Sequence, residues 1–208
     1  MTLSEQQTDE RAQVQGKPSA TGGRRHVLVE WVVIVIVALV AALLIKTFAI
    51  QAFYIPSQSM EPTLMPGDRV LVNKLAYDFH SVHTGDIVVF RRPPNDTTPG
   101  IDDLIKRVIG LPGQTVDVAN CRVYINGKEL AQPYLPKGWQ EPSSEYCTVW
   151  PASSPLPDPY KVPAGYYFVM GDNRQDSYDS RYWGPLPASY IVGRAFVRMW
   201  PPSRLGFL

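Results

Sequence analysis

The stretch Asp103-Leu-Ile-Lys-Arg-Val-Ile109 decides the fold class of this chain of 208 residues. Its aliphatic and β-branched residues are typical of a strand, and the turn sequence Gly110-Leu-Pro-Gly113 ends it. Because side chains alternate between the two faces of a strand, Lys106 and Arg107 should point in opposite directions. Lys106 would then lie among aliphatic neighbours, although a lysine on a solvated strand face is the ordinary alternative.

Further runs with strand character lie on both sides of this stretch. They are Asp68–Lys74, Asp86–Arg91, Val116–Val118, Arg122–Gly127, Tyr166–Met170 and Ile191–Trp200. The Asn-Gly pair that closes Arg122–Gly127 predicts a hairpin turn. Of the 20 prolines, 8 lie between Pro133 and Pro163, which disfavours long helices there. We therefore expect a mainly β fold, with antiparallel sheets curled toward a partly open barrel and a small β/loop insertion at about 120–163.

One segment departs from this β pattern. Val27–Ile50 carries only Glu30 and Lys46 as charges, and its uninterrupted apolar run, Trp31–Ile45, has 15 residues. As a helix, these 24 residues would extend ~36 Å and could cross a hydrocarbon core of ~30 Å with the two charges reaching toward the interfaces. The absence of a polar face at helical period disfavours a buried core helix. A cleaved signal peptide is a second alternative.

Flanking charges predict the orientation of this span. Four basic residues precede it: Arg11, Lys17, Arg24 and Arg25. Since positive flanks remain in the cytoplasm, we expect a single-pass cell-membrane protein with a cytoplasmic N-terminus. Residues 1–26, which are rich in polar side chains, should form a disordered cytoplasmic tail, and residues 27–50 the transmembrane helix. Residues 51–208 would form the extracytoplasmic domain.

Charge and cysteine usage narrow the possible functions. With 20 basic and 19 acidic residues the net charge is +1, which argues against binding of nucleic acid. Cys121 and Cys147 both fall in the expected extracytoplasmic part, where oxidising conditions favour a disulfide over two free thiols. No further cysteine and no histidine cluster accompanies them, so we expect neither a metal site nor a cofactor.

Two polar stretches indicate a functional site. Ile55-Pro-Ser-Gln-Ser-Met-Glu-Pro-Thr-Leu64, just beyond the predicted span, holds two serines between two prolines. An ordinary polar linker would fit this stretch equally well. Gly171-Asp-Asn-Arg-Gln-Asp-Ser-Tyr-Asp-Ser-Arg-Tyr-Trp-Gly184 interleaves acidic and basic residues, as in a hydrated loop or in a hydrogen-bonded network around a site.

Together with Gly67-Asp-Arg-Val-Leu-Val-Asn-Lys74 and Ile105-Lys-Arg-Val-Ile-Gly-Leu-Pro-Gly113, these two stretches resemble the successive motifs of bacterial type I signal peptidases. They occur in that family's order and follow a membrane anchor. The resemblance implies a serine endopeptidase that removes signal peptides from exported preproteins at the lipid bilayer. Cleavage would follow small residues, in an Ala-x-Ala-like pattern.

Position by position, the resemblance implies Ser59 as nucleophile and Lys106 as general base of a dyad that forms an acyl-enzyme. Ser57 would complete the oxyanion hole beside the backbone N–H of Ser59, and Ser177 would orient the lysine. Two ion pairs would brace the site: Arg107 with Asp172, and Arg181 with Asp179. The residues Gln175-Asp176 and Gln114 depart from the family's usual pattern, which puts contacts of these loops in question rather than the dyad.

A lysine can act as a base near neutral pH only if its pKa is lowered. The reference value is ~10.4, and full burial can lower it by ~3–5 units. Reaching ~8 costs roughly 3 kcal/mol, which is acceptable for one lysine in a strand. Histidine is the alternative base, but His26 precedes the span, and we interpret His80 and His83 as solvated loop residues.

Two other classes of protein remain to be weighed. A self-cleaving repressor-type Ser/Lys peptidase would not need a membrane span, and this chain has no DNA-binding region. A membrane-anchored β-rich binding protein without turnover would be expected to lack Ser59 or Lys106, and both are present.

Overall fold

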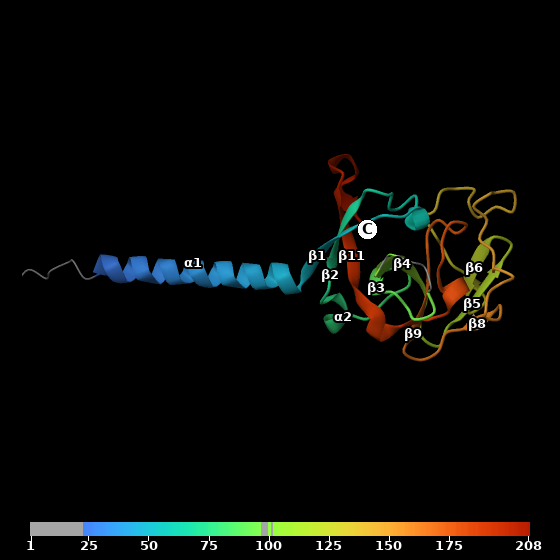
Figure 1. Cartoon of the computed structure of the whole chain (residues 1–208), viewed down its shortest axis with the longest axis horizontal. Helices are drawn as coiled ribbons and strands as arrows, with labels where there is room; N and C mark the ends of the chain where they lie inside the picture. Colours follow the sequence, from blue (N-terminus) through green and yellow to red (C-terminus); the bar gives the residue numbers. More distant parts are fainter. Residues whose placement is uncertain (1–22, 97–99, 101) are drawn as a thin grey trace, which may run out of the picture. The chain divides into compact units, whose positions relative to one another are not determined.

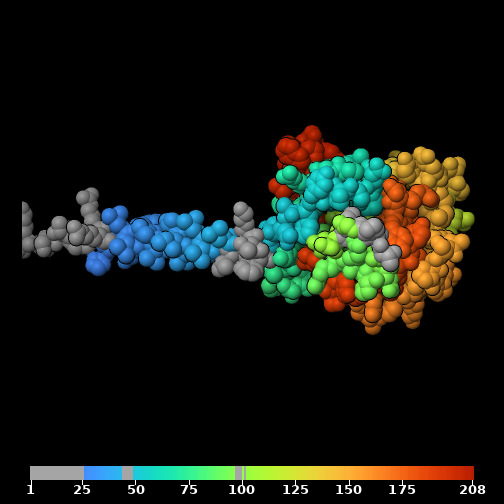
Figure 2. Space-filling model, in the orientation of Figure 1, coloured from blue at the N-terminus to red at the C-terminus, as the bar shows by residue number. Residues whose placement is uncertain are grey.

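The structure, a computed structural model, describes residues 23–96, 100 and 102–208. The chain divides between Leu43 and Leu44 into two units, which we describe separately. Helix α1 (Gly23–Phe48) contains the predicted span except for its last two residues, and its segment His26–Leu43 has a mean hydropathy of 2.6. The side chains of this segment are exposed (Figure 2). By length and composition the helix can cross a membrane; most of the predicted tail, residues 1–22, lies outside the described residues.

The helix ends two residues before the boundary that hydropathy predicts. The carbonyl of Ala49 accepts a hydrogen bond of 2.8 Å from the N–H of Lys74, and Ile50 already pairs with Asn73 in a sheet. The backbone at Ile50 is therefore part of a strand, although the apolar side chain of Ile50 continues the hydrophobic pattern of the helix. Tertiary pairing sets this boundary rather than the composition of the segment.

The larger of two antiparallel sheets contains the predicted strand around Lys106 (Figure 1). Its strand order is β1-β2-β11-β3-β4-β9-β10, with β12 added to β11. The bounds are β1 Ile50–Tyr54, β2 Arg69–Asn73, β3 Ile87–Arg91, β4 Asp103–Gly110, β9 Tyr166–Met170, β10 Leu186–Pro187, β11 Ile191–Trp200 and β12 Gly206–Phe207. The order ends on β1 and β10, so this part of the described chain is an open sheet. The predicted mainly β, antiparallel class is confirmed, with no closed barrel.

Strand β4 lies inside this sheet, between β3 and β9. Lys106 is directly opposite Val88, which is fully buried, and Arg107 lies between Ile87 and Met170. The alternation predicted from the sequence thus sends two basic side chains to opposite faces of a strand that is covered on both sides. Both side chains are buried, with 4 % of Lys106 and 6 % of Arg107 exposed.

The strands of the smaller sheet lie at the two ends of the predicted insertion, and the stretch between them is irregular. The strand order of this sheet is β7-β6-β5-β8, with bounds β5 Thr115–Ala119, β6 Arg122–Ile125, β7 Lys128–Glu129 and β8 Tyr160–Lys161. It begins at Thr115 rather than near 120, because Val116 pairs with both Ile125 and Tyr160. The predicted hairpin forms at Asn126 (φ 52°) and Gly127 (φ 78°), and these angles are those of a type I′ turn.

Short helices connect the strands. They are the 3₁₀ helix η1 (Gln58–Met60), α2 (Ala76–Phe79), α3 (Ser180–Trp183), and the 3₁₀ helices η2 (Ala188–Tyr190) and η3 (Pro202–Arg204). Met60 and Leu64 are fully buried in the core and fix the turn around η1. Helix α3 begins after Asp179, whose side chain accepts a hydrogen bond from the N–H of Arg181. These two anchored turns carry most of the polar residues singled out above.

Candidate active site

The structure brings Ser59 and Lys106 together, although they are 47 residues apart in the sequence. The Lys106 Nζ lies 2.7 Å from Ser59 Oγ and donates a hydrogen bond to it. Ser59 lies in η1, and its carbonyl accepts a hydrogen bond of 3.1 Å from the N–H of Asn173. The turn that carries the serine is therefore attached both to the core and to the loop that follows β9.

The surroundings of Lys106 alter its acid–base behaviour. Burial disfavours the ammonium form and lowers the pKa of Lys106 to about 8, from an ordinary value of 10.5. The carboxylates of Asp179, Asp96 and Asp172 act in the opposite direction and keep the pKa from falling further. At neutral pH a useful fraction of the amine is therefore unprotonated, as a general base requires.

A second serine hydroxyl lies beside the first. Ser57 Oγ is 3.2 Å from Ser59 Oγ, and Ser57 has an extended backbone (φ −122°, ψ 160°) just before η1. The extended residue followed by a tight turn directs both hydroxyls to the same place. This arrangement can offer a hydroxyl and a backbone N–H to one oxygen atom.

Arg107 and Asp172 form a buried pair on the other face of β4. Arg107 Nε lies 2.8 Å from Oδ1 of Asp172, and its terminal nitrogen 2.7 Å from Oδ2. Thr63 Oγ1 also donates to Asp172, at 2.5 Å, and Arg107 donates to the Gly85 carbonyl, at 2.8 Å. The guanidinium carbon lies 3.7 Å from the ring centroid of Tyr134, close enough for a cation–π contact. Both members of the pair are thus fully engaged, which a buried charge requires.

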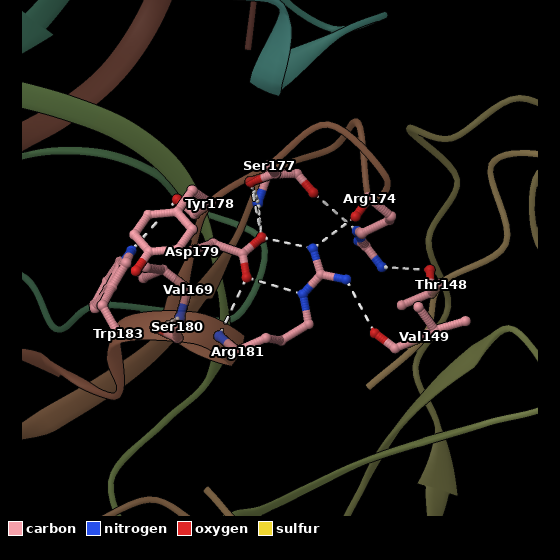
Figure 3. Close-up of polar contacts among 11 residues, drawn as sticks. Thr148, Val149, Val169, Arg174, Ser177, Tyr178, Asp179, Ser180, Arg181 and Trp183 are labelled. Carbon is pink, nitrogen blue, oxygen red and sulfur yellow. Dashed lines mark hydrogen bonds and ion pairs between the residues drawn. The ribbon is translucent and has the colours of Figure 1, made fainter. Parts of the chain in front are cut away.

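Asp179 is the centre of the second network (Figure 3). Its two carboxylate oxygens accept hydrogen bonds of 2.9 Å from two nitrogens of Arg181. One of them also accepts from Ser177 Oγ at 2.8 Å and from the N–H of Gly171 at 3.0 Å. Burial alone raises the pKa of Asp179, but the charge of Arg181 and these hydrogen bonds outweigh it, so that the pKa lies below its ordinary value. Asp179 therefore remains a carboxylate in the buried site.

The resemblance assigns Ser177 to Lys106, but its hydroxyl has other partners. Ser177 Oγ donates to Asp179 and accepts from the N–H of Gly171, at 3.2 Å. Between the described residues, no hydrogen bond joins it to the lysine amine. Gly171 lies between Ser59 and Ser177, because a Cβ at this position would overlap the Ser59 carbonyl oxygen and Ser177 Oγ. Ser177 is thus at the site, and its orienting role remains a prediction.

Arg174 is a site residue that the sequence analysis quoted but gave no role. Its side chain is 2 % exposed, and Nε donates to the Gly171 carbonyl at 2.9 Å. The other nitrogens reach the insertion: Gln132 Oε1, the Tyr134 hydroxyl at 3.4 Å and Thr148 Oγ1 at 3.4 Å. The only signal in the sequence was that Arg174 is a charged residue within a polar motif. Its partners in the insertion have no recognisable spacing from it, so the sequence could not predict these contacts.

The departures from the family's pattern also have partners in the structure. Gln114 Oε1 accepts a hydrogen bond of 2.8 Å from the N–H of Leu111 and so closes the turn after β4. Gln175 Nε2 donates to the carbonyl of Cys147 in the insertion. Asp176 is exposed. The first two departures therefore supply contacts of their own to the loops that border the site.

The histidines His80 and His83 do not contribute to the site. His80 and His83 are exposed, and the Nδ1 of His83 lies 4.0 Å from Asp86.

No group of three or more acidic, cysteine or histidine residues that could hold a metal ion occurs in the part of the chain that the structure describes. Cys121 and Cys147 form a disulfide, with 4.7 Å between their Cα atoms.

A serine hydroxyl hydrogen-bonded to a buried lysine of lowered pKa is the arrangement that a serine hydrolase with a lysine base requires. Comparison with known proteins agrees with this class. The family model "Signal peptidase, peptidase S26" matches residues 28–200, and the chain belongs to this family of serine peptidases.

Relatives with assigned names share most of the chain. The probable signal peptidase I-2 of Synechocystis is 44 % identical and covers 83 % of this chain and 73 % of its own length. The signal peptidase I of Leptolyngbya laminosa is 44 % identical, with 87 % and 84 % covered, and the signal peptidase IB of Staphylococcus aureus 36 %, with 86 % and 93 % covered. A crystal structure of an Enterococcus faecalis signal peptidase I aligns with 55 % of this chain and 97 % of its own, at 32 % identity and a TM-score of 0.43.

Proposed function

We propose that this protein is a membrane-anchored endopeptidase that removes signal peptides from preproteins, with Ser59 as nucleophile and Lys106 as general base. The observation that carries the proposal is the 2.7 Å hydrogen bond between a serine hydroxyl and a buried lysine amine. Membership of the signal peptidase family supports the substrate class.

The reaction has two halves, acylation of Ser59 and hydrolysis of the acyl-enzyme, and Lys106 serves as the base in both. The neutral Lys106 amine accepts the Ser59 hydroxyl proton as Oγ attacks the scissile carbonyl. The oxyanion that forms accepts hydrogen bonds from the Ser59 N–H and the Ser57 hydroxyl. The Lys106 ammonium then donates its proton to the departing amine, and an ester on Ser59 remains. Water, deprotonated by the same amine, attacks this ester. The ammonium returns the proton to Ser59 Oγ as the ester bond breaks, and the signal peptide leaves as a carboxylic acid.

Two sets of hydrogen bonds fix the positions of Lys106 and Ser59 relative to each other. The Arg107–Asp172 pair joins β4, which carries the lysine, to the loop after β9, and Asn173 of that loop binds the Ser59 carbonyl. Asp179 holds Ser177 and Gly171 at the same loop. Since these residues touch neither substrate nor reacting atoms, they are positioning residues. Family resemblance supports a substrate that lies extended and has small residues before the cleaved bond.

Chain connectivity supports action at a membrane. Ser59 follows Phe48, the last residue of α1, by 11 residues. A segment of that length reaches at most ~40 Å even when fully extended. We infer that α1 is a single-pass anchor, that the N-terminus is cytoplasmic and that the body acts outside, near the membrane surface. A preprotein still held by its own hydrophobic segment is within reach of such a site.

Cleavage of a defined precursor tests the proposal. The purified full chain, in detergent or in lipid vesicles, is incubated with a preprotein that has alanine at the first and third positions before its cleavage site. We expect a single mature product whose N-terminus is the residue after the second alanine. A matched precursor with phenylalanine at the first position should not be cleaved. Binding of the precursor without any product would favour a binding protein and contradict the proposal.

The pH dependence of turnover follows from the lysine. Because the base acts only when unprotonated and its pKa is about 8, kcat/KM should rise about tenfold per pH unit below that value and level off above it. The measurement is kcat/KM on the alanine precursor between about pH 6 and pH 10. A midpoint near ~6.5, the ordinary pKa of histidine, would assign the base to another residue.

A further inference from the structure

Three side chains from the loop after β9 and the start of α3 bind three consecutive residues of the insertion. The hydrogen bonds run from Gln175 to the Cys147 carbonyl, from Arg174 to the Thr148 hydroxyl (3.4 Å) and from Arg181 to the Val149 carbonyl (3.1 Å). We call Cys147–Val149 the clamp segment. Figure 3 shows Thr148 and Val149 beside the two arginines, and in Figure 2 the insertion and this loop, yellow to orange, lie side by side.

The clamp segment lies in a long irregular stretch, and two contacts with Cys121 attach it to the rest of the fold. Between β7 and β8, residues 130–159, the structure assigns no helix or paired strand beyond a single bridge from Thr148 to Cys121. The disulfide joins that same Cys121 to Cys147. Cys121 directly precedes β6, so the bridge and the disulfide together attach the clamp segment to the small sheet.

The contacts of the clamp segment continue to the proposed nucleophile. Arg181, which binds Val149, holds both oxygens of Asp179 and also donates to the Arg174 carbonyl at 2.7 Å. Asp179 in turn holds the N–H of Gly171, and Gly171 packs against the Ser59 carbonyl so closely that no side chain fits. Each step is a contact between groups that are at least nine-tenths buried, apart from Val149 itself.

We propose that the clamp segment positions the loop Gly171–Arg181 against Ser59 and Lys106, and that the Cys121–Cys147 disulfide sets the place of the clamp segment. This inference rests on the proposed peptidase function. Arg174 and Arg181 are buried cations, and loss of their partners at 148 and 149 leaves N–H groups that only water can satisfy. Water that enters there approaches a lysine whose reactivity depends on its exclusion.

Reduction of the disulfide should therefore slow the reaction. A dithiol reductant gives two electrons and two protons to the bridge, the Sγ–Sγ bond breaks, and two thiols form while the reductant becomes a cyclic disulfide. We expect kcat to fall by at least about tenfold and by up to about a hundredfold, since a misplacement of catalytic groups by about 1 Å can cost about a hundredfold. KM should stay within about twofold, because the clamp segment does not contact the dyad.

The experiment compares the wild-type protein, with and without dithiothreitol, with the Cys121→Ser/Cys147→Ser variant. All samples are assayed at a temperature at which near-ultraviolet circular dichroism shows them folded. The variant should match the reduced wild type, should not respond to dithiothreitol, and should reach half-maximal kcat/KM at a higher pH. A merely structural disulfide would leave the pH profile of the folded fraction unchanged. The matched control is Glu129→Gln, which removes an exposed ion pair with Arg122 in the same sheet and should leave kcat unchanged.

A folded variant with wild-type kcat and an unshifted pH profile would overturn the inference. If the variant does not accumulate, reduction of the folded wild-type protein decides the question by the same two readouts. Failure of the proposed function itself looks different. In that case the oxidised wild-type protein would not cleave the alanine precursor at all, whereas failure of this inference alone leaves cleavage intact under both redox conditions.

Discussion

Replacement of Ser59 by alanine is expected to lower kcat on a signal-peptide precursor by about 10⁴- to 10⁶-fold, as loss of the nucleophile does in other serine peptidases. The variant should fold normally, since its turn is held by Met60 and Leu64 and by the backbone bond to Asn173, none of which uses the hydroxyl. Mass spectrometry of the precursor after prolonged incubation measures the residual turnover, and circular dichroism checks the fold.

Two further serine variants make the result specific. Ser57→Ala should lose about 10²- to 10³-fold, the usual effect of removing one donor from an oxyanion hole. Ser81→Ala should retain full turnover, because this serine is exposed in the loop before β3. Near-normal cleavage by Ser59→Ala would refute the dyad, and equal losses in Ser57→Ala and Ser59→Ala would leave the nucleophile unassigned to either position.

Replacement of Lys106 by methionine should abolish turnover and stabilise the protein at neutral pH. Methionine fills a similar volume without a charge. The difference between the ordinary lysine pKa of 10.5 and about 8 in the folded protein corresponds to about 3 kcal/mol at ~1.36 kcal/mol per pH unit. Deducting ~1 kcal/mol for the lost hydrogen bond to Ser59 leaves a gain of about 2 kcal/mol in the free energy of unfolding.

The pH dependence of that gain has a definite sign. The unfolded lysine binds a proton up to about pH 10.5, but the folded one only up to about 8. The penalty for the buried charge is therefore complete below pH 8, and it shrinks as the pH rises toward 10.5. Denaturant unfolding of wild type and variant at several pH values measures the difference. Lys128→Met, at an exposed position of β7, should change stability by less than ~0.5 kcal/mol. If Lys106→Met were less stable than wild type at pH 7, burial of the wild-type ammonium would carry no net free-energy penalty, and the prediction would be wrong.

Most of the larger sheet could be predicted because each strand carries its own local signal. The runs that became β4, β9 and β11 combine β-branched residues with glycine or proline at their ends, and their bounds agree with the structure to within a residue. Strand β1 gave no such signal, since Ile50 continues the apolar character of the helix before it. Only its pairing with Asn73 shows where the helix stops.

The sequence by itself predicted the class of fold and the apolar helix and singled out Ser59 and Lys106 as the proposed dyad, because motif order and strand alternation are properties of a linear chain. It could not show that Lys106 is buried on both sides, that Ser177 bonds to Asp179, or that Arg174 reaches Thr148. Those facts join segments that are far apart in the chain. Tertiary structure alone decides them, since desolvation and hydrogen-bond geometry depend on which segments pack together and not on their order.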